Sequence, residues 1–311
     1  MRSSRSAWGS IVLVAIVVAV AHGCSRERAP PLPGPGAPAA AQEAGATYES
    51  AHYRARSTAT PEQTRTVLAA AEALHAAYLQ TFGLQDQAGQ GKRQLVLYAN
   101  RGEFRAHNRS SAWAEAYYLA PTCYAYYPEG AANPYHWMLH EATHQLNHEV
   151  AGLKPAKWLS EGLASYFGAS RLQDGRLHPG TIDPDAYPIW WLADLRLSGD
   201  VQADIRDRRI VALRTLIASD DRTDLNRRFN QYYIGYWSLS HFLFHYEDGK
   251  YAAGFRALIG DGGSLADFER RIGPVDEIER EWYEYLQTVA AGDAGSFVEA
   301  VPAAAPGPAA R

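Results

Sequence analysis

The chain has 311 residues, of which 47% are hydrophobic and eight are tryptophan, enough for one large or two medium domains with well-filled cores. Thirty Lys and Arg residues against 34 Asp and Glu residues give a net charge of −4, and no basic cluster interrupts the mixed charges. A nucleic-acid partner is therefore not expected.

The N-terminus carries the features of an export signal. Two arginines precede an apolar run at 11–21, which is too short for an ordinary membrane span. The AHGC sequence that ends at Cys24 resembles a bacterial lipoprotein signal, which implies a signal peptide over 1–23 and a lipid anchor at Cys24. We therefore expect an exported, membrane-anchored protein of the bacterial cell envelope. An ordinary cleaved signal and an uncleaved anchor are the alternatives. With Cys24 lipidated, Cys123 has no intrachain partner and is expected to be a buried apolar thiol.

Segments rich in Pro, Ala and Gly flank the part of the chain that can fold. The sequence APPLPGPGAPAAAQEAGA cannot bury an apolar face, so residues 24–46 are predicted to be a flexible tether. Residues 294–311 have a similar composition and are predicted to be a disordered tail. The folded domain is expected over 47–293, with subdomains at about 47–182 and 183–293.

The first part of this domain predicts a small sheet with two helices. Alternating β-forming residues predict strands at 48–58 and 92–100. Apolar residues at helical spacing predict a helix over 61–82, and a short helix follows at 101–113. The segments AEAYYLA and CYAYYPE predict a hairpin that leads to the next helix. The tyrosines of this hairpin are either an aromatic substrate wall or one face of a half-buried sheet.

The next predicted helix, WMLHEATHQLNHEV (137–150), carries three histidines at intervals of four. Four residues advance about 400° and roughly 6 Å along a helix, so His140 and His144 can converge on one metal ion. His148 lies about 12 Å beyond His140 and is expected to be a polar residue outside the site. Glu141 is rotated about 100° from His140, so it can reach a water at the metal without binding the metal itself. This is the HExxH arrangement, in which the glutamate is the general base. A chance match on a surface helix is the alternative.

A third ligand is expected, because a catalytic zinc usually takes three protein ligands and keeps one position open. After Gly152 and Pro155 end the first helix, WLSEGLASYF (158–167) predicts an apolar helix with one acidic residue, Glu161. A carboxylate among apolar neighbours needs a partner if it is buried, and a metal ion is one such partner. Gly162 is expected to let this helix approach the HExxH helix closely.

HEATH followed by WLSEGLASYF resembles the gluzincin branch of zinc metallopeptidases, and more narrowly the bacterial peptidase-MA-like domains. The resemblance implies one Zn²⁺ held by His140, His144 and Glu161, with Glu141 as the general base. It also implies an α+β, zincin-like fold, with a small mixed sheet and the HExxH helix in the N-terminal half and mainly helices in the C-terminal half. Ser165 stands where some gluzincins have an aspartate that orients a ligand histidine.

From position 183 onward, helical segments alternate with Gly and Asp residues, and the resemblance implies that the catalytic cleft lies between the two halves. Peptidase-MA-like domains show a tyrosine four residues before a tryptophan. Here Tyr233 precedes Trp237 in the segment 230–245, which also contains other tyrosines and two histidines. Tyr233 is therefore the candidate donor to the oxyanion that develops during hydrolysis. Simple packing in the core is the alternative.

Together these features predict a cell-envelope zinc metallopeptidase that hydrolyses a peptide or protein substrate. One alternative is an envelope binding or scaffold lipoprotein that keeps zinc but has no turnover. Glu141 argues against it, because a structural zinc site needs no base and usually fills its fourth position with protein. A second alternative is a hydrolase of a non-peptide amide in cell-wall polymer, which the sequence does not separate from a peptidase.

Overall fold

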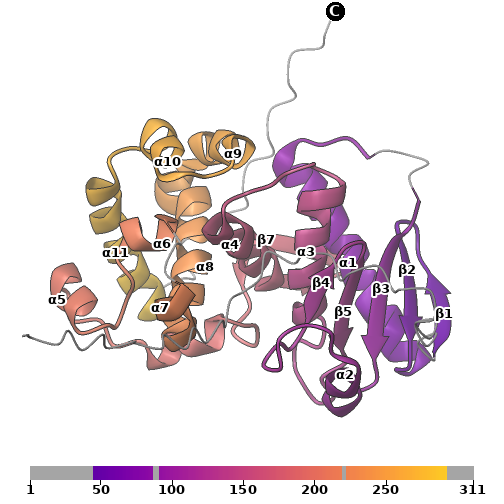
Figure 1. The fold of residues 1–311 in the computed structure, drawn as a ribbon. Coiled ribbons are helices and arrows are strands. Elements are labelled where there is room, and N and C mark those ends of the chain that lie inside the picture. The colour runs from indigo at the N-terminus through magenta and orange to yellow at the C-terminus, as the bar shows by residue number, and fades with distance from the viewer. Residues whose placement is uncertain (1–44, 87–90, 219–221, 293–311) are drawn as a thin grey trace, which may run out of the picture. The chain divides into compact units, whose positions relative to one another are not determined.

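The computed structural model describes residues 45–86, 91–218 and 222–292 of the chain. These residues form a mixed α+β fold, with a five-stranded sheet in the N-terminal half and helices in the C-terminal half (Figure 1). The predicted α+β class is therefore confirmed. The predicted signal peptide, Cys24, the tether up to residue 44 and the C-terminal tail lie outside the described residues. Within the described ranges, no helix combines the length and the apolar character that crossing a membrane requires.

The sheet combines parallel and antiparallel strands in the order β1-β2-β3-β5-β4. The three central strands are parallel, and each edge strand is antiparallel to its neighbour. The strands are β1 (Ala46–Glu49), β2 (Tyr53–Ser57), β3 (Arg93–Tyr98), β4 (Tyr117–Leu119) and β5 (Thr122–Tyr126). The single strand predicted over 48–58 is wrong, because a bend at 51–52 divides that segment into an antiparallel hairpin. The hairpin predicted from the tyrosine-rich segments is confirmed as β4 and β5.

The helices of the N-terminal half are α1 (Pro61–Phe82), α2 (Arg101–His107), α3 (His136–Glu149) and α4 (Lys157–Gly168). Helix α1 begins and ends at the predicted residues. The side chain of Thr60 accepts a hydrogen bond from the backbone N–H of Gln63, and the side-chain oxygen of Gln63 accepts one from the backbone N–H of Thr60. The helix ends at Gly83, which takes a left-handed conformation with φ of 62°.

Both faces of the central strands β3 and β5 are largely buried, whereas Arg54 on one face of β2 is exposed. Leu95 and Leu97 of β3 belong to the main core, which includes residues of α1 and α3, whereas Val96 lies in a smaller cluster with Phe104 of α2. This division follows from the strand pleat, which points successive side chains to opposite faces. Cys123 of β5 belongs to the main core as a fully buried free thiol, and burial raises its pKa well above the usual range. The prediction of a buried apolar thiol is confirmed.

A hairpin that we did not predict follows α4, and helices make up most of the remaining chain. The hairpin consists of β6 (Ser170–Gln173) and β7 (Arg176–Ile182). The helices are η1 (Ile189–Asp194), α5 (Val201–Arg206), α6 (Leu213–Ala218), α7 (Arg222–Arg227), α8 (Phe229–His245), η2 (Tyr246–Gly249), α9 (Ala252–Asp261), α10 (Leu265–Arg271) and α11 (Val275–Ala290). Helix α8 is buried almost all round, as expected for a helix at the centre of a helical subdomain.

Helix α4 packs against α3 on one side and α8 on the other (Figure 1). The expectation that Gly162 faces α3 is wrong. A Cβ at Gly162 would lie 2.3 Å from Oγ of Ser240 and 2.8 Å from the carbonyl oxygen of Tyr236, both in α8. The glycine that faces α3 is Gly168, where a Cβ would lie 3.4 Å from the backbone nitrogen of His140. Two close helix contacts thus hold α4 between the two halves of the fold.

Candidate metal centre

Helices α3 and α4 bring three of the predicted site residues together. Nε2 of His140 lies 3.4 Å from Oε2 of Glu161, and Nε2 of His144 lies 3.7 Å from the same oxygen. One ligand atom from each residue lies within 4.8 Å of the other two. Tetrahedral zinc with bonds of about 2.0–2.1 Å holds its ligand atoms roughly 3.3 Å apart. The donor set and its spacing therefore fit a zinc ion after small side-chain movements.

Two serines lie near the cluster, and His148 lies outside it, as predicted. Nδ1 of His144 lies 3.1 Å from Oγ of Ser160, a hydrogen bond that orients the ring. Ser165, at the position of the gluzincin aspartate, is fully buried, and its hydroxyl has no hydrogen-bond partner among the described residues. His148 is exposed and lies outside the cluster, with Nδ1 3.4 Å from the hydroxyl of Tyr118.

The cluster is an ion pair at the helix interface, in which His140 is buried and His144 and Glu161 are partly buried. Burial alone would raise the pKa of Glu161, but the hydrogen bond from His140 and the charges of both histidines lower it to about 2. Burial would lower the pKa of His140, whereas its hydrogen bond with Glu161 and the charges of Glu141 and Glu161 raise it. Burial lowers the pKa of His144 to about 4 despite the attraction of Glu161. Glu161 is therefore ionised and His144 is neutral near pH 7, the forms in which both groups bind a cation.

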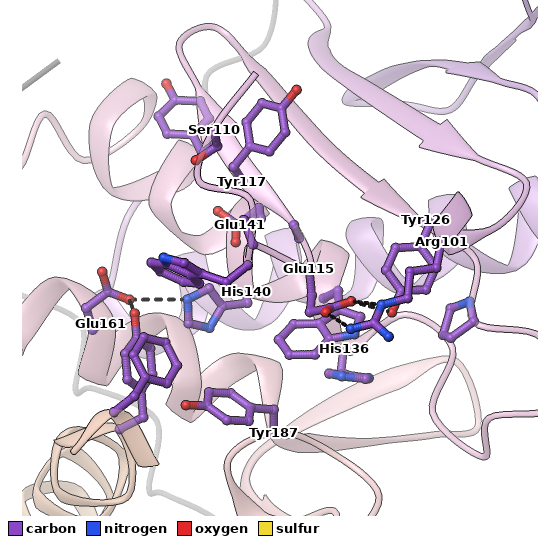
Figure 2. A pocket seen from close by; sticks show the side chains of 18 of the residues that line it. Arg101, Ser110, Glu115, Tyr117, Tyr126, His136, His140, Glu141, Glu161 and Tyr187 are labelled. Atoms are coloured by element: carbon purple, nitrogen blue, oxygen red, sulfur yellow. Dashed lines mark hydrogen bonds and ion pairs between the residues drawn. The ribbon is translucent and has the colours of Figure 1, made fainter. Parts of the chain in front are cut away.

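Glu141 is buried beside the cluster without belonging to it. Burial raises the pKa of Glu141 to about 7. The charge of His140 lowers this pKa, and repulsion by Glu161 raises it. A hydrogen bond from the backbone N–H of Tyr118 lowers the pKa slightly and ties the carboxylate to strand β4. Figure 2 shows Glu141 on the cleft side of α3, close to the ring of His140.

Tyr233 reaches the cluster from α8. Its hydroxyl donates a hydrogen bond of 3.1 Å to Oε2 of Glu161, the oxygen that faces both histidines. Its ring stacks on Phe229, with centroids 4.3 Å apart, and burial raises its pKa well above the usual range, so the hydroxyl keeps its proton. Trp237 is buried in the core. Of the tyrosines and histidines in 230–245, Tyr233 alone lines the cleft beside the cluster.

Residues 137–258 match a sequence family described as a protein of unknown function, DUF1570. No curated protein is similar enough in sequence to match this chain. The DUF1570 segment runs from α3 into α9, so it contains His140, His144, Glu161, Glu141 and Tyr233. The family description names no activity, and the function has to be inferred from the site.

The cluster opens into a cleft of about 640 Å³ that residues of both halves of the chain line. The DUF1570 segment supplies α3, α4, η1 and the start of α8, while β4 and the residues before it come from the preceding sheet. Figure 2 shows Glu161 and His140 at one side of the cleft and the Arg101–Glu115 ion pair at the other. A volume of this size is typical of small-molecule and peptide side-chain sites.

The wall of the cleft is mainly aromatic. Trp113, Trp190 and Trp191 line it and expose 55%, 40% and 37% of their surfaces, although large apolar side chains are normally buried. In the β4–β5 hairpin, Tyr117 and Tyr126 belong to the smaller core cluster, as predicted for a half-buried sheet, and they also line the cleft. The role of these tyrosines as a substrate wall stays a prediction. The sequence reasoning missed the three tryptophans, which lie in a loop and in the 3₁₀ helix η1.

The sequence reasoning also missed His136, four residues before His140 on α3. Its side chain is buried in the wall of the cleft, and its Nδ1 lies 2.8 Å from the carbonyl oxygen of Asn133. Its Nε2 has no hydrogen-bond partner among the described residues, and burial lowers its pKa to about 4. The four-residue interval that relates His136 to His140 was the available signal, because it puts both rings on one helix face.

Proposed function

We propose that this chain is a zinc metallopeptidase with a gluzincin-type site in a zincin-like fold. The observation that carries the proposal is the convergence of His140, His144 and Glu161 at the side of a cleft, with Glu141 buried next to them. A purely structural zinc site usually has four protein ligands and no neighbouring base. Here the described residues supply three ligands, and the cleft leaves room for a substrate.

His140 and His144 would hold Zn²⁺ through their Nε2 atoms, and Glu161 would hold it through its carboxylate. When bound, the ion supplies Lewis acidity that polarises the scissile carbonyl and lowers the pKa of water. Glu141 accepts the proton of the attacking water and passes it to the leaving amine. The protonated hydroxyl of Tyr233, which points at the cluster, donates to the oxygen of the scissile carbonyl as negative charge develops there.

Strand β4 supports a peptide as the substrate. It is an edge strand with β5 as its one neighbour in the sheet, and residues 113–118 line the cleft. An edge strand offers backbone donors and acceptors with which an extended peptide can pair. The backbone of Tyr118 already contacts Glu141, so a peptide paired along β4 would pass beside the proposed base.

The aromatic wall supports a substrate with a large apolar side chain next to the scissile bond. Tyr187 and Trp190 stand 5.7 Å apart, and Tyr187 also contacts Tyr233 at 5.4 Å between ring centroids. An apolar side chain that packs against the exposed surface of Trp190, beside these contacting rings, would displace water from it.

The test is Glu141→Gln in the full chain. This change keeps the size of the side chain and removes its ability to accept a proton. Both proteins are loaded with the same amount of zinc, and new amino termini from a peptide library are measured by mass spectrometry. The rate kcat/KM should fall roughly 10²–10⁴-fold at unchanged zinc content. The same change at Glu62, an exposed residue of α1, is the matched control and should leave the rate unchanged.

Equal cleavage by Glu141→Gln and the unmodified chain would remove Glu141 from the mechanism. A zinc-loaded chain that cleaves no peptide would contradict the peptidase proposal. Cleavage of amides in cell-wall fragments under the same conditions would then reassign the site to a non-peptide amide.

A further inference from the structure

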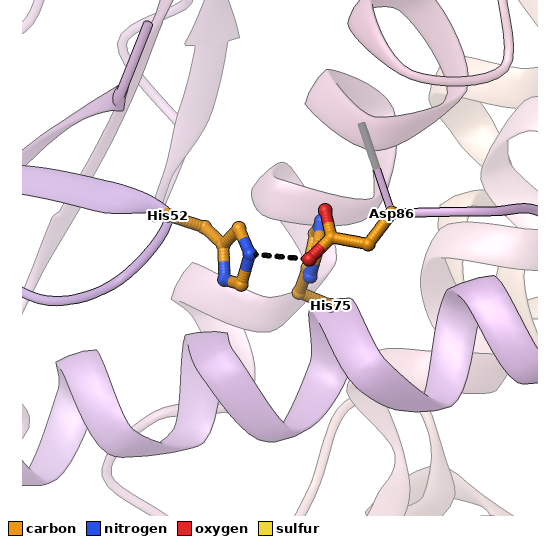
Figure 3. Close-up of side chains that lie close together, drawn as sticks. All are labelled: His52, His75 and Asp86. Atoms are coloured by element: carbon orange, nitrogen blue, oxygen red, sulfur yellow. Dashed lines mark hydrogen bonds and ion pairs between the residues drawn. The ribbon is translucent and has the colours of Figure 1, made fainter. Parts of the chain in front are cut away.

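A second group of metal-ligating side chains lies at the opposite end of the sheet from β4. His52 is in the bend between β1 and β2, His75 is in α1, and Asp86 follows the end of α1. One ligand atom from each lies within 4.8 Å of the other two. Figure 3 shows the carboxylate of Asp86 beside the ring of His75, with both facing His52. None of the three residues lines the cleft.

A second carboxylate, that of Glu72, is hydrogen-bonded to the other ring nitrogen of His52. Nδ1 of His52 lies 2.6 Å from Oε2 of Glu72, and Nε2 lies 3.0 Å from Oδ2 of Asp86. The other oxygen of Glu72 accepts hydrogen bonds from the backbone N–H of His52 at 2.7 Å and from the hydroxyl of Ser50 at 2.5 Å. Glu72 is therefore fixed in position and directs Nε2 of His52 toward Asp86. A carboxylate that binds the outer nitrogen is the usual support of a metal-ligating histidine.

His75 is the member of the group that an ion-pair network does not explain. It is 3% exposed on an alanine-rich face of α1, and no residue in the described ranges makes a hydrogen bond to its ring. Its ring stacks on His52 with centroids 4.0 Å apart, and burial and the charge of His52 lower its pKa to about 4. A buried neutral imidazole normally has a partner for its ring nitrogens. A cation between His75 and Asp86 would be such a partner.

We propose that His52, His75 and Asp86 form a second zinc-binding site, independent of the proposed catalytic centre. Two imidazole nitrogens and one carboxylate oxygen are a donor set that suits Zn²⁺. The rings of His52 and His75 are stacked, so one of them must turn for both nitrogens to face the same ion. Binding replaces the proton that His52 shares with Asp86, so one proton leaves as the ion enters. The ion would connect the β1–β2 bend and the segment after α1 to α1 itself.

The experiment uses the full chain with His140→Gln and His144→Gln, which removes the first cluster. After equilibrium dialysis against Zn²⁺, metal analysis should find one zinc per chain. Adding His52→Gln and Asp86→Asn should abolish this zinc at the same free concentration. Both side chains are at the surface, with 28% and 52% of their area exposed, so the fold should tolerate the changes. His178→Gln, at an exposed histidine outside both clusters, is the matched control and should retain the zinc.

Two further measurements distinguish a specific zinc site from nonspecific zinc binding. Zinc should raise the melting temperature of the first variant and not that of the second, because an ion that binds only the folded state stabilises it. Glu72→Gln in the first variant should weaken zinc binding 10–100-fold, the usual effect of removing a supporting carboxylate. The proposal is overturned if the His140→Gln, His144→Gln chain holds no zinc, or if the added changes leave its zinc in place. Failure of the catalytic proposal gives a different result. The unmodified chain would then keep the zinc at His52, His75 and Asp86 and would cleave no peptide.

Discussion

Replacing Gly162 with alanine would insert a methyl group into the contact between α4 and α8. Its Cβ would lie 2.3 Å from Oγ of Ser240, which can rotate away, and 2.8 Å from the backbone oxygen of Tyr236, which cannot. Overpacking of this kind costs about 1–3 kcal/mol. The gain from replacing glycine in a helix offsets up to about 1 kcal/mol of that cost. Because a backbone oxygen at this distance cannot move away, we take about 2–3 kcal/mol for the overpacking and expect a net loss of about 1–2 kcal/mol in the free energy of unfolding.

The same displacement would reach the metal centre, because Glu161 precedes Gly162 and accepts its hydrogen bond from Tyr233 of α8. Urea unfolding gives the stability change, and zinc titration gives the change in metal affinity. Gly260→Ala is the matched control, since this helical glycine of α9 has no atom within 4 Å of its would-be Cβ and should gain up to about 1 kcal/mol. If Gly162→Ala is as stable as the unmodified chain, the close contact of α4 and α8 is not as the structure describes it.

Three further predictions concern Tyr233, Asp204 and Cys24. Tyr233→Phe removes only the hydroxyl that points at Glu161 and should lower kcat about 10²–10³-fold with KM nearly unchanged. A loss of kcat below about threefold at full zinc content would mean that Tyr233 only packs in the core. Burial would raise the pKa of the fully buried Asp204, but hydrogen bonds from Tyr283 and two neighbours lower it to about 2. Asp204→Asn should therefore cost about 2–3 kcal/mol in unfolding free energy at pH 7. Because a depressed pKa stabilises above the unfolded value, this difference should shrink as the pH falls from about 4 toward 2, and a pH-independent difference would contradict it. Cys24→Ser should move the protein from the membrane fraction to the soluble fraction, whereas retention in membranes would favour an uncleaved anchor.

The residues of the candidate metal cluster could be predicted because each helix carries a local sequence pattern that marks them. Residues four apart share a helix face, so His140 and His144 face the same way. Glu161 stands out because it is the one acidic residue of an apolar helix. The partner of Gly162 could not be predicted in the same way. Helix α4 has a neighbour on each side, and helical periodicity says which residues are buried without saying which neighbour they face.

The sequence reasoning missed one local bend and several contacts between distant segments. The bend that separates β1 from β2 has no Gly or Pro, so its residues read as one continuous strand. The tryptophans of η1 reach the cleft only through the packing of the two halves. The second cluster joins His52, His75 and Asp86 across 34 residues of chain, and no spacing rule connects a bend, a helix face and a loop.

The most direct test of the central claim is a zinc-edge anomalous difference map from crystals of the full chain grown with Zn²⁺. The account predicts a peak about 2.0–2.2 Å from Nε2 of His140, Nε2 of His144 and a carboxylate oxygen of Glu161, whatever the occupancy at His52 and His75. A chain that contains zinc but shows no peak between His140, His144 and Glu161 would contradict it.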